Sequence, residues 1–171
     1  MDDIEKEFID AYENNADQIF GYCLIKVSDR EKAKDLLQDT FMRLWNFMRK
    51  GKKVEKHRVF IYRIASNLII DHYRKKKESS LDAMIESSGN EPVDSEEMGV
   101  KIKYRIDGEI VIRLLEEIPN IYKDVIYMHY IDDLSISEIS DIVGESANNV
   151  SVRLHRGISK LKKIYYDYEK R

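Results

Sequence analysis

Asp133-Leu-Ser-Ile-Ser-Glu-Ile-Ser-Asp-Ile-Val-Gly144 is the stretch that decides the fold, and after a short turn it is followed by Asn148-Asn-Val-Ser-Val-Arg-Leu-His-Arg156. Ser135 and Glu138 have the S-x-x-E spacing of a capping box, so we expect a helix to begin there. Gly144 is suited to end that helix, because glycine adopts the left-handed conformation of a helix C-terminus without steric cost. Ser146 can then cap a second helix. The pattern predicts a helix-turn-helix.

The second of these helices has two chemically different sides. Apolar residues recur at helical spacing on one side, at Val150, Leu154, Ile158 and Leu161. The other side carries polar and small residues, namely Asn148, Asn149, Val152, Arg156 and Ser159. Asn can hydrogen-bond the edge of adenine, Arg that of guanine, and Val can contact a thymine methyl group. We therefore expect this side to read the DNA major groove. The alternative is a helical hairpin whose polar side only contacts water.

Composition limits the fold class. The chain has 171 residues, two Pro, seven Gly and 43% hydrophobic residues, which predicts an all-α protein with room for one domain or two small ones. A single cysteine, Cys23, excludes an internal disulfide and a cysteine-based metal cluster, and its place on the apolar side of a predicted helix indicates a buried thiol. The N-terminus lacks the basic and apolar parts of a signal peptide and no apolar run is long enough to cross a bilayer, so we expect a cytoplasmic protein without membrane insertion.

Charge is segregated along the chain although the net charge is only −3. Residues 1–17 carry seven acids against one Lys, whereas residues 30–77 carry fifteen Lys or Arg against five acids. Residues 78–100 carry seven acids and no basic residue, and residues 153–163 carry five basic residues and no acid. Two basic blocks separated by an acidic one suggest two nucleic-acid contacts, although each block alone is equally consistent with solvated helix faces.

Apolar periodicity divides the chain into helical segments. We expect three helices in the first part of the chain. The first covers residues 4–27, the second begins at a capping box formed by Ser28 and Glu31, and the third covers residues 58–76. In the first of them Phe8, Tyr12, Ile19 and Cys23 are expected to point inward. The Ser-rich and acidic segment that follows predicts a flexible linker, after which Pro119 separates two further helices. The predicted organisation is a helical domain over residues 1–77, a linker over 78–103 and a helix-turn-helix domain over 104–171.

Two further surfaces are candidates for binding. On the helix that begins near residue 31, the outer face carries Asp35, Gln38, Asp39, Met42, Arg43 and Asn46. Carboxylates around an exposed methionine suggest a docking surface for a basic helix, and the alternative is an ordinary solvated face. The segment from Lys50 to Lys77 combines basic residues with Phe60, Tyr62 and Tyr73, the combination by which proteins hold single-stranded nucleic acid. At least one of Phe60 and Tyr73 is expected in the hydrophobic core.

Three motifs in this order resemble the bacterial RNA polymerase sigma factors of the extracytoplasmic-function type. They are Asp35-Leu-Leu-Gln-Asp-Thr-Phe-Met-Arg-Leu-Trp45, Phe60-Ile-Tyr-Arg-Ile-Ala-Ser-Asn-Leu-Ile-Ile-Asp-His-Tyr-Arg74, and the segment from Leu115-Glu-Glu-Ile-Pro119 to Leu154-His-Arg156. The resemblance implies a first domain that binds the polymerase core and opens and captures the minus-ten promoter element. It implies a second domain that binds the minus-thirty-five element as duplex, and it leaves room for an anti-sigma partner.

The resemblance also implies roles for particular residues. The clamp helices of the largest polymerase subunit would contact Asp35, Gln38, Asp39, Met42 and Arg43. The minus-ten strand would lie near Lys52, Lys53, His57, Arg63, Asn67 and Arg74. The minus-thirty-five duplex would contact Asn148, Asn149, Ser151, Val152, Arg153, His155 and Arg156. Glu145 departs from the family pattern and is expected to place a negative charge near the DNA.

No catalytic constellation competes with this interpretation. The four histidines are dispersed without metal-ligand spacing, and no glycine cluster builds a phosphate loop, so we expect neither an enzyme nor a bound cofactor. One alternative is a helix-turn-helix regulator that binds duplex DNA without joining polymerase. A second, a nucleic-acid enzyme, would require clustered carboxylates facing the basic surface, and the sequence suggests none.

Overall fold

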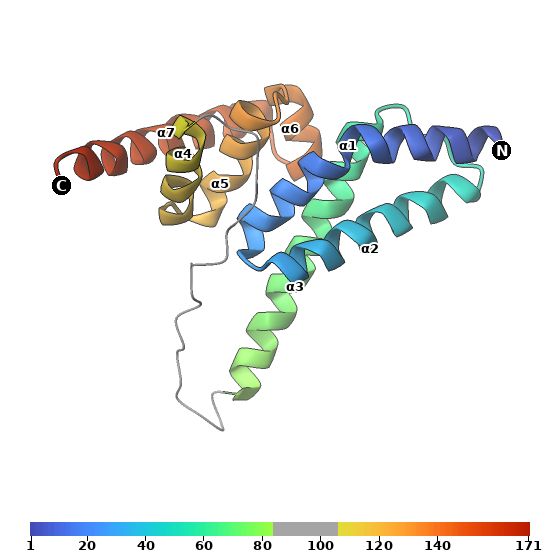
Figure 1. Cartoon of the computed structure of the whole chain (residues 1–171), viewed down its shortest axis with the longest axis horizontal. Helices are drawn as coiled ribbons and strands as arrows, with labels where there is room; N and C mark the ends of the chain where they lie inside the picture. The colour runs from blue at the N-terminus through green and yellow to red at the C-terminus, as the bar shows by residue number, and fades with distance from the viewer. Residues whose placement is uncertain (84–105) are drawn as a thin grey trace.

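The structure of the protein, a computed structural model, describes residues 1–83 and 106–171, and both parts are helical (Figure 1). The first part contains three helices, α1 (Asp3–Val27), α2 (Arg30–Arg49) and α3 (His57–Ala83). The second contains α4 (Ile106–Glu117), α5 (Asn120–Ile126), the π-helical turn η2 (Tyr127–Ile131), α6 (Ile136–Val143) and α7 (Ala147–Glu169). No strand occurs in either described part, so the predicted all-α class is confirmed.

Helices α1, α2 and α3 pack on one another around a shared apolar core. Ile19 and Cys23 of α1, Leu44 of α2 and Ile61 of α3 are completely buried there. The expected inward position of Tyr12 is wrong, because 44% of its surface is exposed at the edge of α1 and α2. Apolar spacing alone placed Tyr12 on the buried side. In the structure its ring packs edge-on against buried Phe41, with the centroids 4.7 Å apart, and its other side faces solvent.

Two helix boundaries differ from the predicted ones. Ser28 does not cap α2; it ends α1 in the left-handed conformation, with φ of 52°. Asp29 is the actual N-cap, and its carboxylate accepts a hydrogen bond from the Lys32 backbone N–H at 3.0 Å. Helix α3 continues to Ala83, so the first residues of the expected linker are helical. The remainder of that linker, up to residue 103, lies outside the described residues.

The predicted helix-turn-helix is formed by α6 and α7. Ser135 and Glu138 make the capping box, and Gly144 ends α6 with φ of 71°. The Ser146 hydroxyl accepts from the Asn149 N–H and begins α7. Buried Val150 and Leu154 fix α7 against the body of the domain. Local side-chain chemistry therefore sets the turn, as the sequence predicted.

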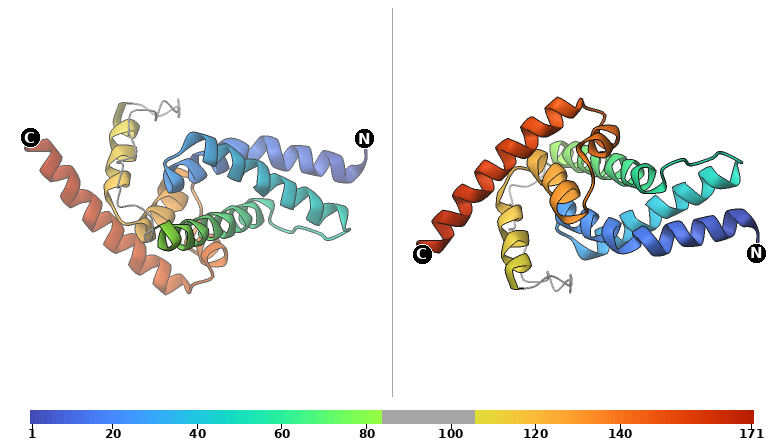
Figure 2. Two further views of the ribbon diagram at one scale, coloured as in Figure 1. Left: turned by 90° about the horizontal axis from the view of Figure 1, so that it is seen from below. Right: turned by 90° about the horizontal axis from the view of Figure 1, so that it is seen from above.

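The two parts of the chain pack against each other and share one buried cluster. Helix α3 contacts α6, and α1 contacts α5 and α4. Lys26 of α1 makes a largely buried ion pair with Asp124 of α5, while the Tyr73 hydroxyl of α3 donates to the Lys26 carbonyl. Helix α7 extends away from this junction, so the N- and C-termini lie at opposite ends of the molecule (Figures 1 and 2).

Candidate nucleic-acid interface

The first candidate surface is the solvent-facing side of α7. Asn148, Asn149, His155 and Arg156 are exposed, and 38% of the Val152 surface is exposed. Ser151 is half-buried. The first turn of α7 contains no acidic residue, so its N-terminal partial positive charge remains available to an anion such as a phosphate. The surface thus combines amide and guanidinium groups, which can hydrogen-bond base edges, with a helix end that favours anions.

Arg153, which the sequence analysis assigned to the duplex, makes contacts within the protein. Its Nε donates to the Ile121 carbonyl at 3.0 Å, and its Nη1 lies 2.9 Å from a carboxylate oxygen of Glu145. Only 12% of the Arg153 side chain is exposed. The guanidinium therefore joins α7 to α5 and to the turn before α7. The charge of Glu145, which was expected to face DNA, is compensated by this internal pair.

The second candidate surface is formed by α3 and the connection before it. Lys52, Lys53, Asn67 and Arg74 are exposed, and Arg74 pairs with Asp71 at 3.2 Å on the same helix. His57 is half-buried, with its Nε2 2.8 Å from a carboxylate oxygen of Glu7. The first four remain accessible to a ligand, whereas His57 is already paired with α1.

A hollow of about 390 Å³ lies at the start of α3. Its lining combines aliphatic, aromatic and basic side chains, at Phe47, Lys53, Val54, Glu55, Lys56, Val59, Phe60, Arg63 and Asp141. The rings of Phe47 and Phe60 lie 4.6 Å apart, and the Lys52 ammonium lies 5.2 Å from the centre of the Phe47 ring. This hollow was not predicted, because it depends on the course of the connection between α2 and α3. Asp141, in α6, comes from the other half of the chain.

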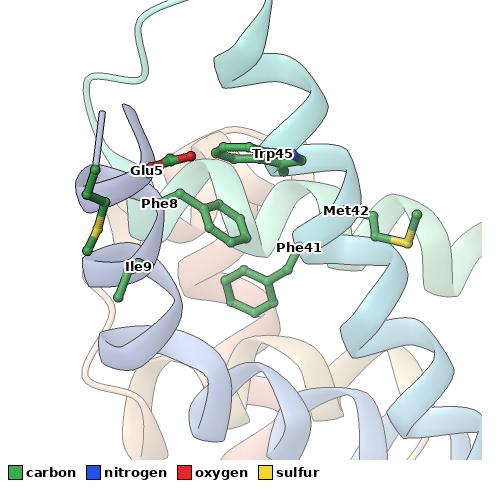
Figure 3. Close-up of a pocket in the computed structure, with 7 residues that line it drawn as sticks. Glu5, Phe8, Ile9, Phe41, Met42 and Trp45 are labelled. Atoms are coloured by element: carbon green, nitrogen blue, oxygen red, sulfur yellow. The ribbon is translucent and has the colours of Figure 1, made fainter. Parts of the chain in front are cut away.

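An apolar groove separates α1 from α2 at their outer end (Figure 3). It encloses about 410 Å³ and is lined by Met1, Glu5, Phe8, Ile9, Phe41, Met42 and Trp45. The Phe8 ring centroid lies 5.1 Å from that of Trp45, with the rings tilted by 58°, and 6.3 Å from that of Phe41, with the rings edge-on at 81°. Met42, which the sequence singled out, projects from the outer side of α2. Asp35, Gln38, Asp39 and Arg43 are exposed along the same helix.

Two buried titratable groups have altered acidity. Burial raises the pKa of the Cys23 thiol to about 12, so this cysteine stays protonated and unreactive at neutral pH. Burial also raises the pKa of Asp132 to about 7, against the opposing effect of Arg58 and with a further rise from Asp133. Among the described residues no group of His, Cys, Asp and Glu is arranged to hold a metal ion.

Comparison with known proteins places these surfaces in a family context. Residues 11–79 match the family Sigma-70 region 2, and residues 108–161 match Sigma-70, region 4. RNA polymerase sigma factor SigZ of Bacillus subtilis is 30% identical over 146 residues, which are 84% of this chain and 78% of SigZ. The ECF sigma factor SigW of the same organism is 29% identical over 168 residues, covering 94% of this chain and 89% of SigW.

Solved structures have the same fold. Sigma factor RpoE of Bartonella quintana, in complex with the anti-sigma factor NepR, superposes with a TM-score of 0.75 at 18% identity, covering 94% of this chain and 98% of that one. CnrH, in complex with the cytosolic domain of CnrY, gives a TM-score of 0.67 at 17% identity, with 95% and 90% covered.

The chain belongs to the extracytoplasmic-function type of bacterial RNA polymerase sigma factors. As a sigma factor, it binds core RNA polymerase, recognises promoter DNA and initiates transcription. The alternative function, a helix-turn-helix regulator that binds duplex DNA without joining polymerase, is not favoured. Among the helices that the structure describes, none is both long enough and apolar enough to cross a membrane.

Proposed function

We propose that the two parts of this sigma factor read promoter DNA in different physical states. Residues 1–77 would bind core polymerase and the opened minus-ten strand, and residues 104–171 would bind the minus-thirty-five element as duplex. The observation that carries this division is chemical: the exposed side of α7 offers Asn and Arg for base edges, whereas the start of α3 offers an aromatic and basic hollow. An opened base can enter such a hollow, but a paired one cannot.

In the duplex-binding half, we assign base contacts to Asn148, Asn149, Val152 and Arg156. His155 and Ser151 lie beside them and are assigned to the groove wall or phosphates. Arg153 is assigned a positioning role, because its guanidinium holds α7 to Ile121 and Glu145. Sequence preference should therefore depend on the exposed four residues, and helix placement on Arg153.

In the strand-binding half, Phe60 supplies a ring on which an unstacked base can lie, with Arg63 and Lys53 at the edge of the same hollow. Lys52 and Arg74 are assigned to the strand's phosphates. Asn67 is exposed one turn beyond Arg63 on α3, where its amide can bond a base edge. His57, already paired with Glu7, is assigned a secondary role.

For polymerase docking, we assign the outer face of α2. Asp35, Gln38, Asp39, Met42 and Arg43 are exposed, and 54% of the Met42 surface is accessible. Carboxylates around a flexible thioether suit a basic helical partner, and we identify that partner as the clamp helices of the largest polymerase subunit.

We further propose that the protein works in the cytoplasm, where its polymerase is, and that it has no catalytic activity or cofactor of its own. Of the two solved structures with this fold, RpoE is bound to the anti-sigma factor NepR and CnrH to the cytosolic domain of CnrY. By analogy, we assign an anti-sigma factor as a partner of this chain.

The experiment that tests the division of labour compares Asn67→Ala with Arg156→Ala in transcription complexes assembled from core polymerase. Gel-shift binding to duplex promoter should fall for Arg156→Ala, with a cost of about 1–3 kcal/mol at one base position. Permanganate reactivity of the opened region should fall for Asn67→Ala while duplex binding remains. The opposite pattern, with duplex binding lost in Asn67→Ala and only opening lost in Arg156→Ala, would refute the proposal.

A further inference from the structure

Glu145 stands in the turn between α6 and α7, immediately before the residue that caps α7. Its side chain is 39% exposed, and residues 146–149, which follow it, are exposed as well. In helix-turn-helix proteins the N-terminal end of the second helix contacts the base edges. Glu145 therefore lies at the end of α7 that comes nearest to the bases when this helix binds duplex DNA.

The backbone of this turn is held on both sides of Glu145. Gly144 ends α6 in the left-handed conformation, and its N–H donates to the Ser140 carbonyl at 3.0 Å. The Ser140 hydroxyl donates to the carbonyl of Glu145 itself. On the other side, the Ser146 hydroxyl accepts from the Asn149 N–H at 3.2 Å. The caps of two helices thus fix the point from which the Glu145 side chain extends.

The charge of Glu145 is compensated from within the protein. The Nη1 of Arg153 lies 2.9 Å from the Oε1 of Glu145, and only 12% of the Arg153 side chain is exposed. The pair carries no net charge, so its repulsion of the phosphate backbone is weaker than that of a carboxylate alone. Within residues 1–83 and 106–171, no group donates a hydrogen bond to the second oxygen, Oε2. This oxygen remains able to accept one from a ligand.

A carboxylate discriminates between bases because it only accepts hydrogen bonds. In the major groove guanine presents two acceptors, thymine presents one, and adenine presents an amino donor beside an acceptor. Cytosine alone presents an amino donor without an acceptor of its own. Asn148 and Asn149 carry amides, which both donate and accept. The Glu145 carboxylate therefore offers a selection for cytosine that the neighbouring amides do not provide.

We propose that Glu145 is a specificity-determining residue, which accepts a hydrogen bond from a cytosine amino group in the minus-thirty-five duplex. The cytosine would lie beside the base pairs that Asn148 and Asn149 contact. This inference rests on the proposed binding of duplex DNA by α7. Arg153 supports the selection by compensating the carboxylate charge, so that affinity for the remainder of the element is retained.

The test uses holoenzyme assembled from core polymerase and the full chain, with duplex promoters in which each base pair of the upstream element is replaced in turn. The wild type should prefer cytosine at one position by roughly five- to tenfold. Glu145→Gln keeps an acceptor for Arg153, but its amide also offers donors to the other bases. The cytosine preference should therefore fall below roughly twofold, while preferences at the other positions stay unchanged. Mean affinity over all duplexes should rise, because the Arg153 charge is no longer compensated.

Glu145→Ala, which removes the acceptor without adding a donor, should lose the same cytosine preference. Asp167→Asn is the matched control, because it removes the same charge at an exposed position near the other end of α7, and it should keep that preference. If Glu145→Gln keeps every base preference, or tightens binding to all duplexes by one common factor, the inference is overturned, since the carboxylate then acts only on phosphates. If Asn149→Ala and Arg156→Ala also leave every base preference unchanged, α7 does not read the duplex, and the proposed function fails as well.

Discussion

Replacement of Arg153 by Ala separates positioning from base reading in α7. The guanidinium loses a charge-assisted hydrogen bond to the Ile121 carbonyl, a class of bond that contributes about 1.5–3 kcal/mol. It also loses the Glu145 pair, which adds at most about 1 kcal/mol because Glu145 is partly exposed. We expect the free energy of unfolding of the full chain to fall by about 2–3 kcal/mol. At ~2–4 °C per kcal/mol, the melting temperature should fall by roughly 4–12 °C.

The assay is urea and thermal denaturation followed by circular dichroism, run beside duplex binding to a set of single-base variants of the upstream element. Arg153→Ala should weaken binding to all variants equally, because α7 is less well placed. His155→Ala, at the exposed neighbouring position, is the control and should keep wild-type stability. Wild-type stability of Arg153→Ala together with lost discrimination at one base pair would refute the reasoning and assign Arg153 to direct readout.

Three further predictions follow from other contacts. Charge reversal of Asp35 and Asp39 to Lys should abolish pull-down of core polymerase while leaving the circular dichroism spectrum unchanged, and retained pull-down would exclude this face of α2. The raised pKa of Asp132 means that, between about pH 4 and pH 7, the folded chain holds a proton that the unfolded chain releases. The free energy of unfolding should therefore decline as pH rises from about 4 to about 7 and then level off. In urea titrations Asp132→Asn should lack this pH-dependent decline, whereas Asp133→Asn, at an exposed position, should retain it. Proteolysis should cut first within the Ser-rich and acidic segment that the sequence predicts as a linker. The two fragments should co-elute in gel filtration, because the Lys26–Asp124 and Arg63–Asp141 contacts join the two parts of the chain. Fragments that elute separately would show that these contacts do not hold the two parts together.

Local chemistry explains which features the sequence could predict. The capping box at Ser135, the left-handed Gly144 and the cap at Ser146 each depend on residues within one turn, and all three were predicted. The start of α2 was misplaced by one residue because Ser28 and Asp29 are both good N-caps, and only Ser28 also had to end α1. Adjacent helices with competing caps leave such boundaries undetermined in the sequence.

Non-local contacts explain what the sequence could not predict. Arg153 lies at the border between the buried and exposed sides of α7, and its long side chain reaches the carbonyl of Ile121, 32 residues away. The contact of Arg63 with Asp141 joins residues 78 positions apart, and the hollow at the start of α3 depends on it in part. The groove between α1 and α2 likewise required knowing that Phe8 and Trp45 face each other. Composition and periodicity identify the apolar and polar faces of each helix, but they do not show which faces pack against each other.

The missing side chain at Gly21 ties the evolution of the two halves together. A helix interior ordinarily favours alanine over glycine by about 1 kcal/mol, so selection on α1 alone would replace Gly21. The Tyr127 hydroxyl lies where the added methyl group would stand, so the replacement requires Tyr127 to move or to be replaced by a smaller residue. Sequences that share this contact should therefore vary at positions 21 and 127 as a pair. Exchanging one half of the chain for that of a distant relative should produce a poorly fitting contact between α1 and η2, even when each half keeps its own binding surface.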